Sequence, residues 1–259
     1  MLTRFKERNK PGRPYVLFAS QDECDFVTIF VILVVPENRR ARSRVCDVRV
    51  VGMVSKVLDR NSPDRLRLFR NPWLEKLTVI PLSAFLIVWV ALLPAIAMVG
   101  FRVAPTFWAV PLVLAGLIVW TLAEYALHRY VFHFEARSPL LRQAIFVIHE
   151  NHHADANDPL RNLMPPIVSI PVGLAVWALS VWVLGAQGTW FLLGFMTGYV
   201  TYDLVHFACH QFPMKGRIAR MLKTHHMRHH HLKVEGNYAI TGMIWDRIFS
   251  TRISSVRKA

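Results

Sequence analysis

Cysteine is scarce in this chain. Cys24, Cys46 and Cys209 are the three cysteines among 259 residues, and no two of them are spaced as CxxC. A disulfide scaffold needs a ladder of cysteines, and structural zinc sites are usually rich in cysteine ligands. The composition therefore excludes a disulfide-stapled fold and a cysteine-based zinc site, and it is typical of a protein in a reducing compartment.

Charge is also missing from three long stretches. Residues 77–101, 103–123 and 162–202 contain no Asp, Glu, Lys or Arg. A helix of about 20 apolar residues spans a bilayer, and Gly185–Thr189 divides the last stretch with a plausible turn. The sequence predicts an all-α integral membrane protein with four transmembrane helices and a cytoplasmic, histidine-rich helical cap. The helices are expected at about residues 77–99, 106–127, 167–184 and 190–210.

Acidic residues are few, and the basic ones are unevenly placed. The chain has 31 Lys and Arg against 17 Asp and Glu, and Arg102 is the one basic residue in the two predicted loops between paired spans. This asymmetry follows the positive-inside rule, so we expect both termini and the central loop in the cytoplasm, with Arg102 and Gln187 outside. The excess positive charge then faces anionic lipid headgroups, and we expect no nucleic-acid partner.

Histidine is absent from residues 1–127 and concentrated afterwards. Neutral imidazole is the commonest protein ligand for transition metals. In the predicted topology every histidine lies at the cytoplasmic ends of the spans or in the cytoplasmic segments, as a shared metal site requires. The twelve are His128, His133, His149, His152, His153, His206, His210, His225, His226, His229, His230 and His231.

The spacing of the histidines predicts how they reach a metal. On an α-helix, residues three and four apart share a face, so the two HxxHH motifs (149–153 and 226–230) each offer three imidazoles in one direction, and His206/His210 offer two. His128 and His133 are about 140° apart on an ideal helix, so this pair needs a distorted turn or two different ions. Ten ligands result, enough for two ions, with His225 and His231 left over. Imidazole sites suit Zn, Fe, Cu or Ni.

Two acidic residues lie beside these motifs at the predicted membrane edge. Glu124 is four residues before His128, and Asp203 is three before His206. An unpaired carboxylate is costly there, and ligand imidazoles usually donate their second N–H to a carboxylate. We therefore expect both to orient histidine ligands. The alternative is that each carboxylate simply reaches the polar interface.

Residues 1–52 differ from the remainder. They contain ten basic residues and an apolar patch, 26–35, that is too short to span a bilayer. We predict a poorly ordered basic tail over residues 1–52 and a membrane domain over residues 53–259. A further hypothesis is that the biological start is Met53, which N-terminal sequencing of native protein would decide.

Several segments together resemble the fatty acid hydroxylase superfamily, with a pattern that extends roughly from Leu68 to Thr251. Met164-Pro-Pro166 and Gly198-Tyr-Val-Thr-Tyr-Asp203 narrow the resemblance to the fatty acid 2-hydroxylases, which act on sphingolipid acyl chains. The matching segments are Glu124–Phe134, His149–His153, Arg161–Pro166, Gly198–His210, Lys223–His230 and Trp245–Asp246.

The resemblance implies a chemistry and a set of ligands. The family's ten metal-binding positions are all filled here, by His128, His133, His149, His152, His153, His206, His210, His226, His229 and His230. It implies two iron ions, although other divalent metals such as zinc can occupy such sites. One oxygen atom of O2 would be inserted at C2 of a long acyl chain, free or in a ceramide, and the other would leave as water.

The resemblance also implies partners. The substrate would be a membrane lipid acyl chain that enters from the bilayer. Larger family members carry a fused b-type cytochrome domain with a His-Pro-Gly-Gly motif, and this sequence has no match to it. We therefore expect a separate electron carrier, either a b-type cytochrome or a ferredoxin with its reductase. The N-terminal tail and the lack of that domain favour a bacterial inner membrane over the endoplasmic reticulum.

Two other classes of function fit part of the pattern. One is a different membrane di-iron lipid oxidation, such as carotenoid hydroxylation, sterol oxidation or desaturation. The other is a non-enzymatic metal-binding membrane protein, such as a transporter or a scaffold. A transporter would place its polar ligands near the bilayer midplane, whereas these histidines are predicted at one edge, so the enzyme is favoured.

Overall fold

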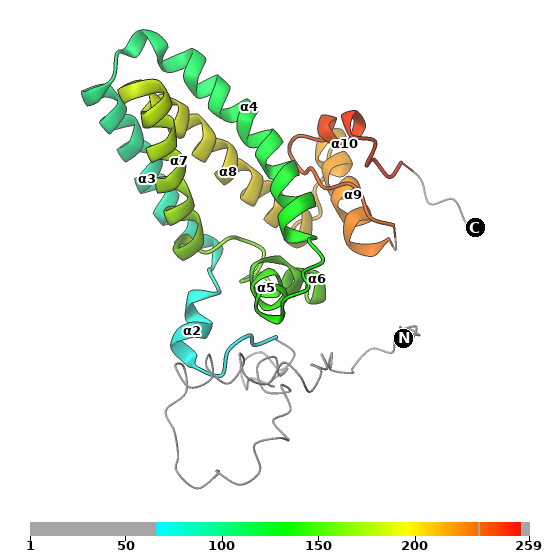
Figure 1. Cartoon of the computed structure of the whole chain (residues 1–259). Helices are drawn as coiled ribbons and strands as arrows, with labels where there is room; N and C mark the ends of the chain where they lie inside the picture. The colour runs from blue at the N-terminus through cyan, green and yellow to red at the C-terminus, as the bar shows by residue number, and fades with distance from the viewer. Residues whose placement is uncertain (1–65, 233, 255–259) are drawn as a thin grey trace, which may run out of the picture. The chain divides into compact units, whose positions relative to one another are not determined.

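The structure is a computed structural model that describes residues 66–232 and 234–254, and the chain from Pro72 onward forms a unit of its own. The predicted basic tail and its boundary at Met53 lie outside the described residues. All regular elements of the described part are helices (Figure 1). They are α2 (Pro72–Leu77), α3 (Leu82–Val103), η4 (Thr106–Trp108), α4 (Ala109–Leu127), η5 (His128–Phe132), α5 (Pro139–Ile145), η6 (Phe146–Glu150), α6 (Asn151–Ala154), α7 (Pro166–Leu184), η7 (Gly185–Gln187), α8 (Gly188–Gln211), α9 (Arg217–His231) and α10 (Ile244–Ile248).

Three helical stretches are long and apolar enough to cross a membrane. They are Leu82–Val103, Thr106–Phe132 and Pro166–Gln211, of which the last is 46 residues long. That last stretch contains α7 and α8, which are joined by the 3-10 turn η7 and pack against each other. The four predicted spans therefore correspond to α3, α4, α7 and α8, and the number of membrane crossings stays a prediction.

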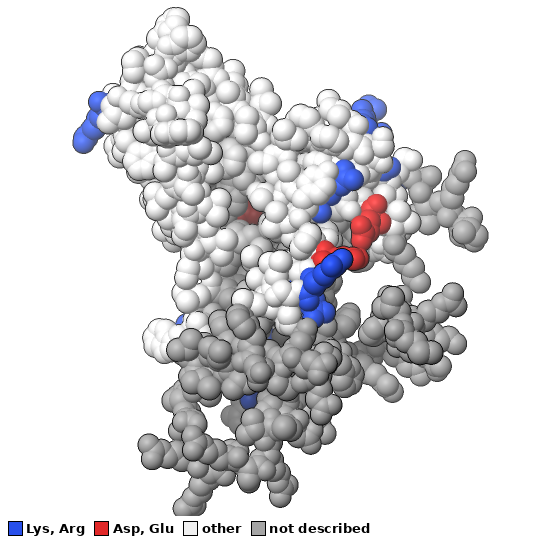
Figure 2. Space-filling view, in the orientation of Figure 1, with Lys and Arg blue, Asp and Glu red and all other residues white. Residues whose placement is uncertain are grey.

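Large apolar side chains cover the outside of these helices. Ile87, Val110, Leu179 and Trp182 are each at least 60% exposed. On the face drawn in Figure 2, the sides of the long helices are almost free of charged side chains. Exposed apolar surface of this extent is unusual for a soluble monomer, and it suits contact with lipid.

Helix α8 is the centre of the bundle and packs against α3, α4 and α7. Its close approach to α4 depends on glycine, because a side chain at Gly194 would clash with the Val113 carbonyl and one at Gly116 with the backbone of α8. Small residues allow membrane helices to pack backbone to backbone in this way. The ring of Trp120 on α4 lies edge-on to Phe195 and Tyr199 of α8.

The shorter helices gather where α4 and α8 finish. Figure 1 shows α5, α6, α9 and α10 at that end of the bundle, away from the η7 turn. Trp245 of α10 donates its indole N–H to Thr121 on α4 at 3.0 Å. The histidine-rich cap expected from the sequence is therefore present as a helical layer at one end, and its placement in the cytoplasm stays a prediction.

Candidate metal centre

Ten histidines come together at this end of the bundle in two groups of five. Within each group, one ring nitrogen from every residue lies within 4.8 Å of those of the other members. The structure therefore brings together all ten residues that the sequence singled out, and His225 and His231 belong to neither group. Group one is His128, His133, His149, His153 and His229, and group two is His152, His206, His210, His226 and His230.

Each HxxHH motif serves both groups. His149 and His153 belong to group one while His152 belongs to group two, and in the second motif His229 alone joins group one. The expectation that each motif points three imidazoles in one direction was wrong. Residues three apart on a helix differ by about 60° and residues four apart by about 40° in the opposite sense, so rings from one motif diverge around two centres that lie side by side.

A π-helical turn explains how His128 and His133 reach the same group. Residues His128–Phe132 form this turn at the end of α4. In a π-turn the backbone hydrogen bonds join residues five apart rather than four apart, so the turn is wider than in an α-helix. The two imidazoles therefore reach the same group, with ring centroids 5.1 Å apart. Of the two alternatives that the sequence left open, the distorted turn is the one observed. A second π-turn, Phe146–Glu150, contains His149, the first residue of the first HxxHH motif.

One asparagine orients two rings of group two. The Asn162 backbone carbonyl lies 2.9 Å from Nδ1 of His206, and its side-chain Oδ1 lies 3.1 Å from Nδ1 of His152. Since oxygen accepts in both bonds, Nδ1 carries the hydrogen in both rings. Their Nε2 atoms then hold lone pairs, which is the form that binds a metal.

Backbone carbonyls do the same for group one. The Gly236 carbonyl accepts from Nδ1 of His229 at 2.8 Å, and the Tyr238 carbonyl accepts from Nδ1 of His128. The Nε2 atom of His128 is buried and has no hydrogen-bond partner among the described residues. Both rings therefore direct an unprotonated nitrogen toward group one.

The contacts between rings fit a metal ion. Nε2 of His206 lies 2.9 Å from Nε2 of His152. Both nitrogens hold lone pairs, so no hydrogen bond links them while the rings are neutral. Two nitrogens each about 2.1 Å from one ion and at right angles to each other would be about 3 Å apart. Seven Nε2–Nε2 separations within the two groups are 2.8–3.2 Å, and all donor atoms of a group lie within 4.8 Å of one another, so the donor set has the dimensions of a metal coordination shell.

Burial keeps the imidazoles outside the long helices neutral. Together with the positive charge that neighbouring imidazoles would carry, burial lowers the pKa of His153 to about 2 and that of His229 to about 4. The pKa of His226 is also well below its ordinary value, chiefly because the ring is buried. Neutral rings are available to bind a cation at physiological pH.

Glu124 has a different role from the one expected. It does not bond an imidazole in the described structure. Its carboxylate accepts the backbone N–H groups of Ile240 and Thr241, each at 2.7 Å, and that of Gly242 at 3.2 Å, together with the Thr241 hydroxyl. It therefore holds the segment whose carbonyls orient His128 and His229.

Asp203 also acts on the histidines through the backbone rather than by a direct hydrogen bond to an imidazole. Its carboxylate accepts the backbone N–H of Met164 at 3.0 Å, while the second nitrogen of His206 goes to the Asn162 carbonyl. The expectation that both acids receive an N–H directly from a ligand imidazole was wrong. Each carboxylate instead holds a backbone segment in place. Backbone carbonyls of these two segments accept the N–H groups of the imidazoles.

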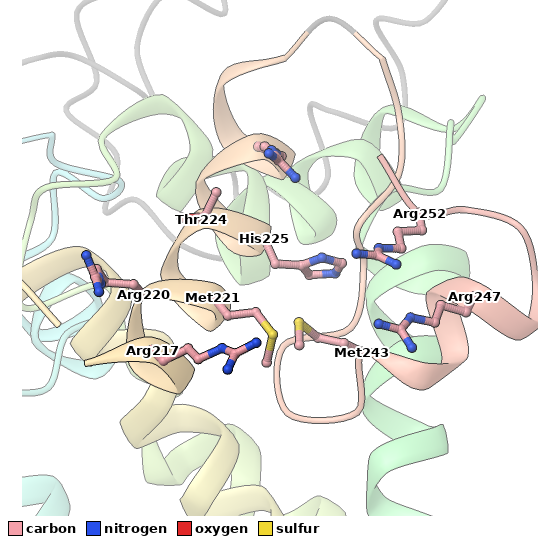
Figure 3. Close-up of a pocket in the computed structure, with 9 residues that line it drawn as sticks. Arg217, Arg220, Met221, Thr224, His225, Met243, Arg247 and Arg252 are labelled. Atoms are coloured by element: carbon pink, nitrogen blue, oxygen red, sulfur yellow. The ribbon is translucent and has the colours of Figure 1, made fainter. Parts of the chain in front are cut away.

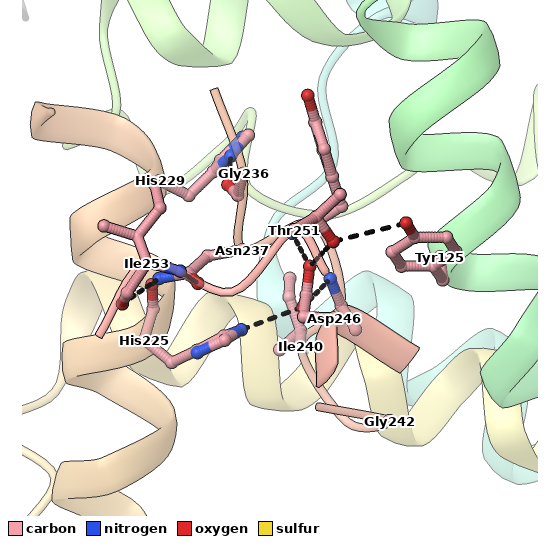
Figure 4. Close-up of polar contacts among 12 residues, drawn as sticks. Tyr125, His225, His229, Gly236, Asn237, Ile240, Gly242, Asp246, Thr251 and Ile253 are labelled. Carbon is pink, nitrogen blue, oxygen red and sulfur yellow. Dashed lines mark hydrogen bonds and ion pairs between the residues drawn. The ribbon is translucent and has the colours of Figure 1, made fainter. Parts of the chain in front are cut away.

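A third buried carboxylate, Asp246, has no role in the sequence-based interpretation. It accepts the backbone N–H groups of Tyr238 and Ala239 at 2.9 Å, and it bonds His225 at 3.0 Å (Figure 4). Asn237 donates to the His225 carbonyl at 3.0 Å and accepts the Ile253 N–H. His225 is thus tied to the loop that orients group one.

The sequence contained one indication of the roles of Asn162 and Asp246, which the sequence analysis missed: their position within the matching motifs. Asn162 and Asp246 both lie in segments that carry the family resemblance, Arg161–Pro166 and Trp245–Asp246. Asn162 opens a long uncharged run, where a polar side chain needs a specific partner. The carbonyls of Gly236 and Tyr238 left no signal, because every residue has one.

Comparison with protein families and curated proteins gives related sequences. A family model described as fatty acid hydroxylase matches residues 113–251. A dihydroceramide fatty acyl 2-hydroxylase of Arabidopsis thaliana is 30% identical over 187 residues, which cover 71% of this chain and 79% of the plant protein. A ceramide very long chain fatty acid hydroxylase of Schizosaccharomyces pombe is 34% identical over 196 residues, which cover 71% of this chain and 54% of the yeast protein.

Two further comparisons extend this result. Human fatty acid 2-hydroxylase is 33% identical over 144 residues, 54% of this chain and 39% of the human protein. The chain thus spans well under two thirds of the yeast and human proteins. A solved structure of full-length scs7p, in which only the hydroxylase domain is visible, superposes with a TM-score of 0.66 at 28% identity and covers 72% of each chain.

Proposed function

The chain belongs to the fatty acid hydroxylase family, and we propose that it hydroxylates C2 of a long acyl chain, either free or amide-linked in a ceramide. The reaction would use O2 and electrons from an external donor. The observation that carries this proposal is the pair of five-imidazole groups at the end of membrane-length helices. The 2-hydroxylase names of the relatives support C2 as the site of reaction.

The ten histidines are the proposed metal ligands, five for each of two ions. His128, His133, His149, His153 and His229 would hold one ion, and His152, His206, His210, His226 and His230 the other. Iron is the proposed metal, and other divalent ions such as zinc would fit the same donors. When bound, the iron pair would supply the reductive activation of O2 that no side chain provides.

The surrounding residues would prepare the ligands. Asn162 and the carbonyls of Gly236 and Tyr238 fix which ring nitrogen carries the hydrogen. Glu124 and Asp203 hold the two backbone segments in place and act as positioning residues. Ligands held in this way need little rearrangement when the metal binds, which favours affinity and defined geometry.

In the proposed membrane arrangement, α3, α4, α7 and α8 each cross the bilayer. Both termini and both histidine groups lie on the cytoplasmic side, as the distribution of Lys and Arg predicts. The acyl tail would enter from the bilayer and present C2 near the metal centre. The electron donor would be a separate b-type cytochrome or a ferredoxin with its reductase, and the favoured location is a bacterial inner membrane.

Lipid analysis of a host that lacks 2-hydroxy acyl lipids tests the proposed function. Expression of the protein together with a compatible electron donor should produce acyl chains heavier by one oxygen, with fragment ions that place the hydroxyl at C2. The variant His152→Ala, expressed to the same level, should produce none. Oxygenated sterols or carotenoids with unchanged acyl chains would contradict the proposal and favour another lipid oxidation.

A further inference from the structure

A pocket rich in arginine lies between α9 and the chain around α10, separate from both histidine groups. It has a volume of about 350 Å³. Figure 3 shows Arg217 on one side and Arg247 and Arg252 on the other, directed into the same space, with Met221 and Met243 between them. The full lining is Arg217, Arg220, Met221, Thr224, His225, Arg228, Met243, Arg247 and Arg252.

The positive charge of this pocket has no counter-charge among the described residues. None of its five arginines takes part in the ion pairs of the described structure. The nearest carboxylate along the chain, Asp246, is fully buried and already accepts hydrogen bonds from Tyr238, Ala239 and His225. Several guanidinium groups around one space favour an anion, and their forked N–H groups match phosphate oxygens.

The pocket lies beside the membrane-length helices. Trp245 of α10 donates a hydrogen bond to Thr121, which lies within the stretch Thr106–Phe132. Helix α9 begins at Arg217, shortly after the membrane-length α8 ends at Gln211. In the proposed arrangement the pocket is therefore at the level of the lipid headgroups.

Exposed apolar side chains lie on α9 and α10, the helices that carry Arg217, Arg220, Arg228 and Arg247. Ile218 on α9 is 70% exposed, and Ile244 and Ile248 on α10 are 60% and 58% exposed. Basic and apolar side chains side by side are typical of a surface that lies in the membrane interface, with the apolar groups among acyl chains and the basic groups against phosphates. A docking site for an acidic soluble protein would instead be expected to have a polar rim.

We propose that this pocket binds the phosphate of an anionic phospholipid headgroup. The lipid would link α9, which carries three of the ten histidines, to α10 and the loop that orients group one. The site requires the membrane arrangement of the proposed function and does not depend on the identity of the oxidised substrate.

The proposal is tested with the purified full-length protein in nanodiscs of phosphatidylcholine, with or without phosphatidylglycerol. Phosphatidylglycerol should raise the midpoint of thermal unfolding, and native mass spectrometry should retain it on the protein. The double variant Arg217→Gln/Arg247→Gln should weaken retention by at least about tenfold. As a matched control, Arg102→Gln, an exposed arginine at the other end of the bundle, should behave as wild type.

Three outcomes would overturn the proposal. One is equal retention of phosphatidylglycerol by wild type and by the double variant. Another is the same stabilisation from inorganic phosphate alone, which would indicate a soluble anion. The third is binding of an acidic electron carrier that depends on these arginines while lipid retention does not.

If the double variant unfolds, the milder variant Arg247→Lys takes its place. It keeps the charge and loses the forked geometry, so it should show a partial loss of phosphatidylglycerol retention. Failure of the hydroxylase assay would leave all these readouts intact.

Discussion

At the scale of single residues, the acceptor behind each imidazole decides whether the ring can bind a metal. Asn162 shows this most clearly, because it orients His206 through its backbone and His152 through its side chain. The two rings then meet with unprotonated nitrogens 2.9 Å apart. Such an arrangement is repulsive without a cation, so the folded protein favours metal binding through its own hydrogen bonds.

The variant His152→Ala tests the division into two groups. His152 contributes to group two, so metal content should fall from about two ions per chain to about one, with group one still occupied. Metal analysis of the purified protein measures this. His231→Ala is the matched control, because His231 is exposed and belongs to neither group. Loss of both ions from a folded variant would contradict independent groups.

Asn162→Ala tests the role of the acceptor. It removes the oxygen that fixes the tautomer of His152 and leaves the backbone carbonyl for His206. Loss of such an outer partner usually lowers metal affinity about 10- to 100-fold. Competition with a chelator measures the change, and Asn162→Asp, which restores an acceptor, should recover most of the affinity. Unchanged affinity in the alanine variant would contradict the assigned role.

Glu124→Gln tests a carboxylate that acts through the backbone. Glutamine keeps one oxygen for the N–H groups of Ile240, Thr241 and Gly242, which all bond Oε1 of Glu124. It replaces Oε2, which accepts the Thr241 hydroxyl, with an NH2 group and removes the carboxylate charge, so we expect a loss of stability of about 1–3 kcal/mol. Metal should also bind more weakly at group one, since the same segment orients His128 and His229. Lower stability without any change at group one would show that the contact is structural only.

The sequence predicted which histidines come together better than it predicted their surroundings. The ten histidines could be identified because imidazoles at helical spacing are rare and chemically specific. The division of each HxxHH motif between the two groups could not be predicted, because it depends on where the facing helices lie. The sequence also could not show whether the imidazoles donate to Glu124 and Asp203 or to backbone carbonyls. Any distant segment can supply a backbone carbonyl once the chain folds.

At the scale of elements, the helix boundaries follow local chemistry. The first span was expected from residue 77 and begins at Leu82, directly after Pro81, which has extended backbone angles. The π-turn His128–Phe132 extends α4 beyond the expected end at residue 127. The other long helices begin and end within three residues of their expected positions. Uncharged runs thus indicate the helices, and proline decides where one of them starts.

Gly194→Ala tests the close contact between α4 and α8. Its methyl group would clash with the Val113 carbonyl, and because backbone cannot move aside as a side chain can, overpacking of about 1–3 kcal/mol is expected. Separation of these helices would also disturb both histidine groups. The midpoint of thermal unfolding and the metal content measure the two effects. Gly173→Ala is the control, because its methyl group would meet only the flexible Met196 side chain.

At the scale of the whole molecule, the histidine groups join three separate parts of the chain. Group two alone contains residues from α6, α8 and α9. Bound metal would therefore link the membrane helices to the terminal layer, and the proposed lipid site would add a second link between α9 and α10. Both links lie at one end of the bundle, so the function depends on which side of the membrane that end faces.

The direction of the chain in the membrane can be tested with single cysteines in a background in which the native three are replaced by serine. If α7 and α8 each cross the bilayer, Gln187→Cys in the turn between them should react with an impermeant maleimide in intact cells. Lys215→Cys, just after α8, should react only after permeabilisation. Arg102→Cys serves as the reference for the outer side, since it lies in the last turn of α3, just before the connection to α4. If Gln187→Cys and Lys215→Cys react from the same side, α8 does not cross the membrane. If both react in intact cells, the histidine groups at the end of α8 lie on the outer side, where a cytoplasmic electron donor could not reach them. If both react only after permeabilisation, α7 and α8 form a re-entrant hairpin, and the histidine groups remain on the cytoplasmic side.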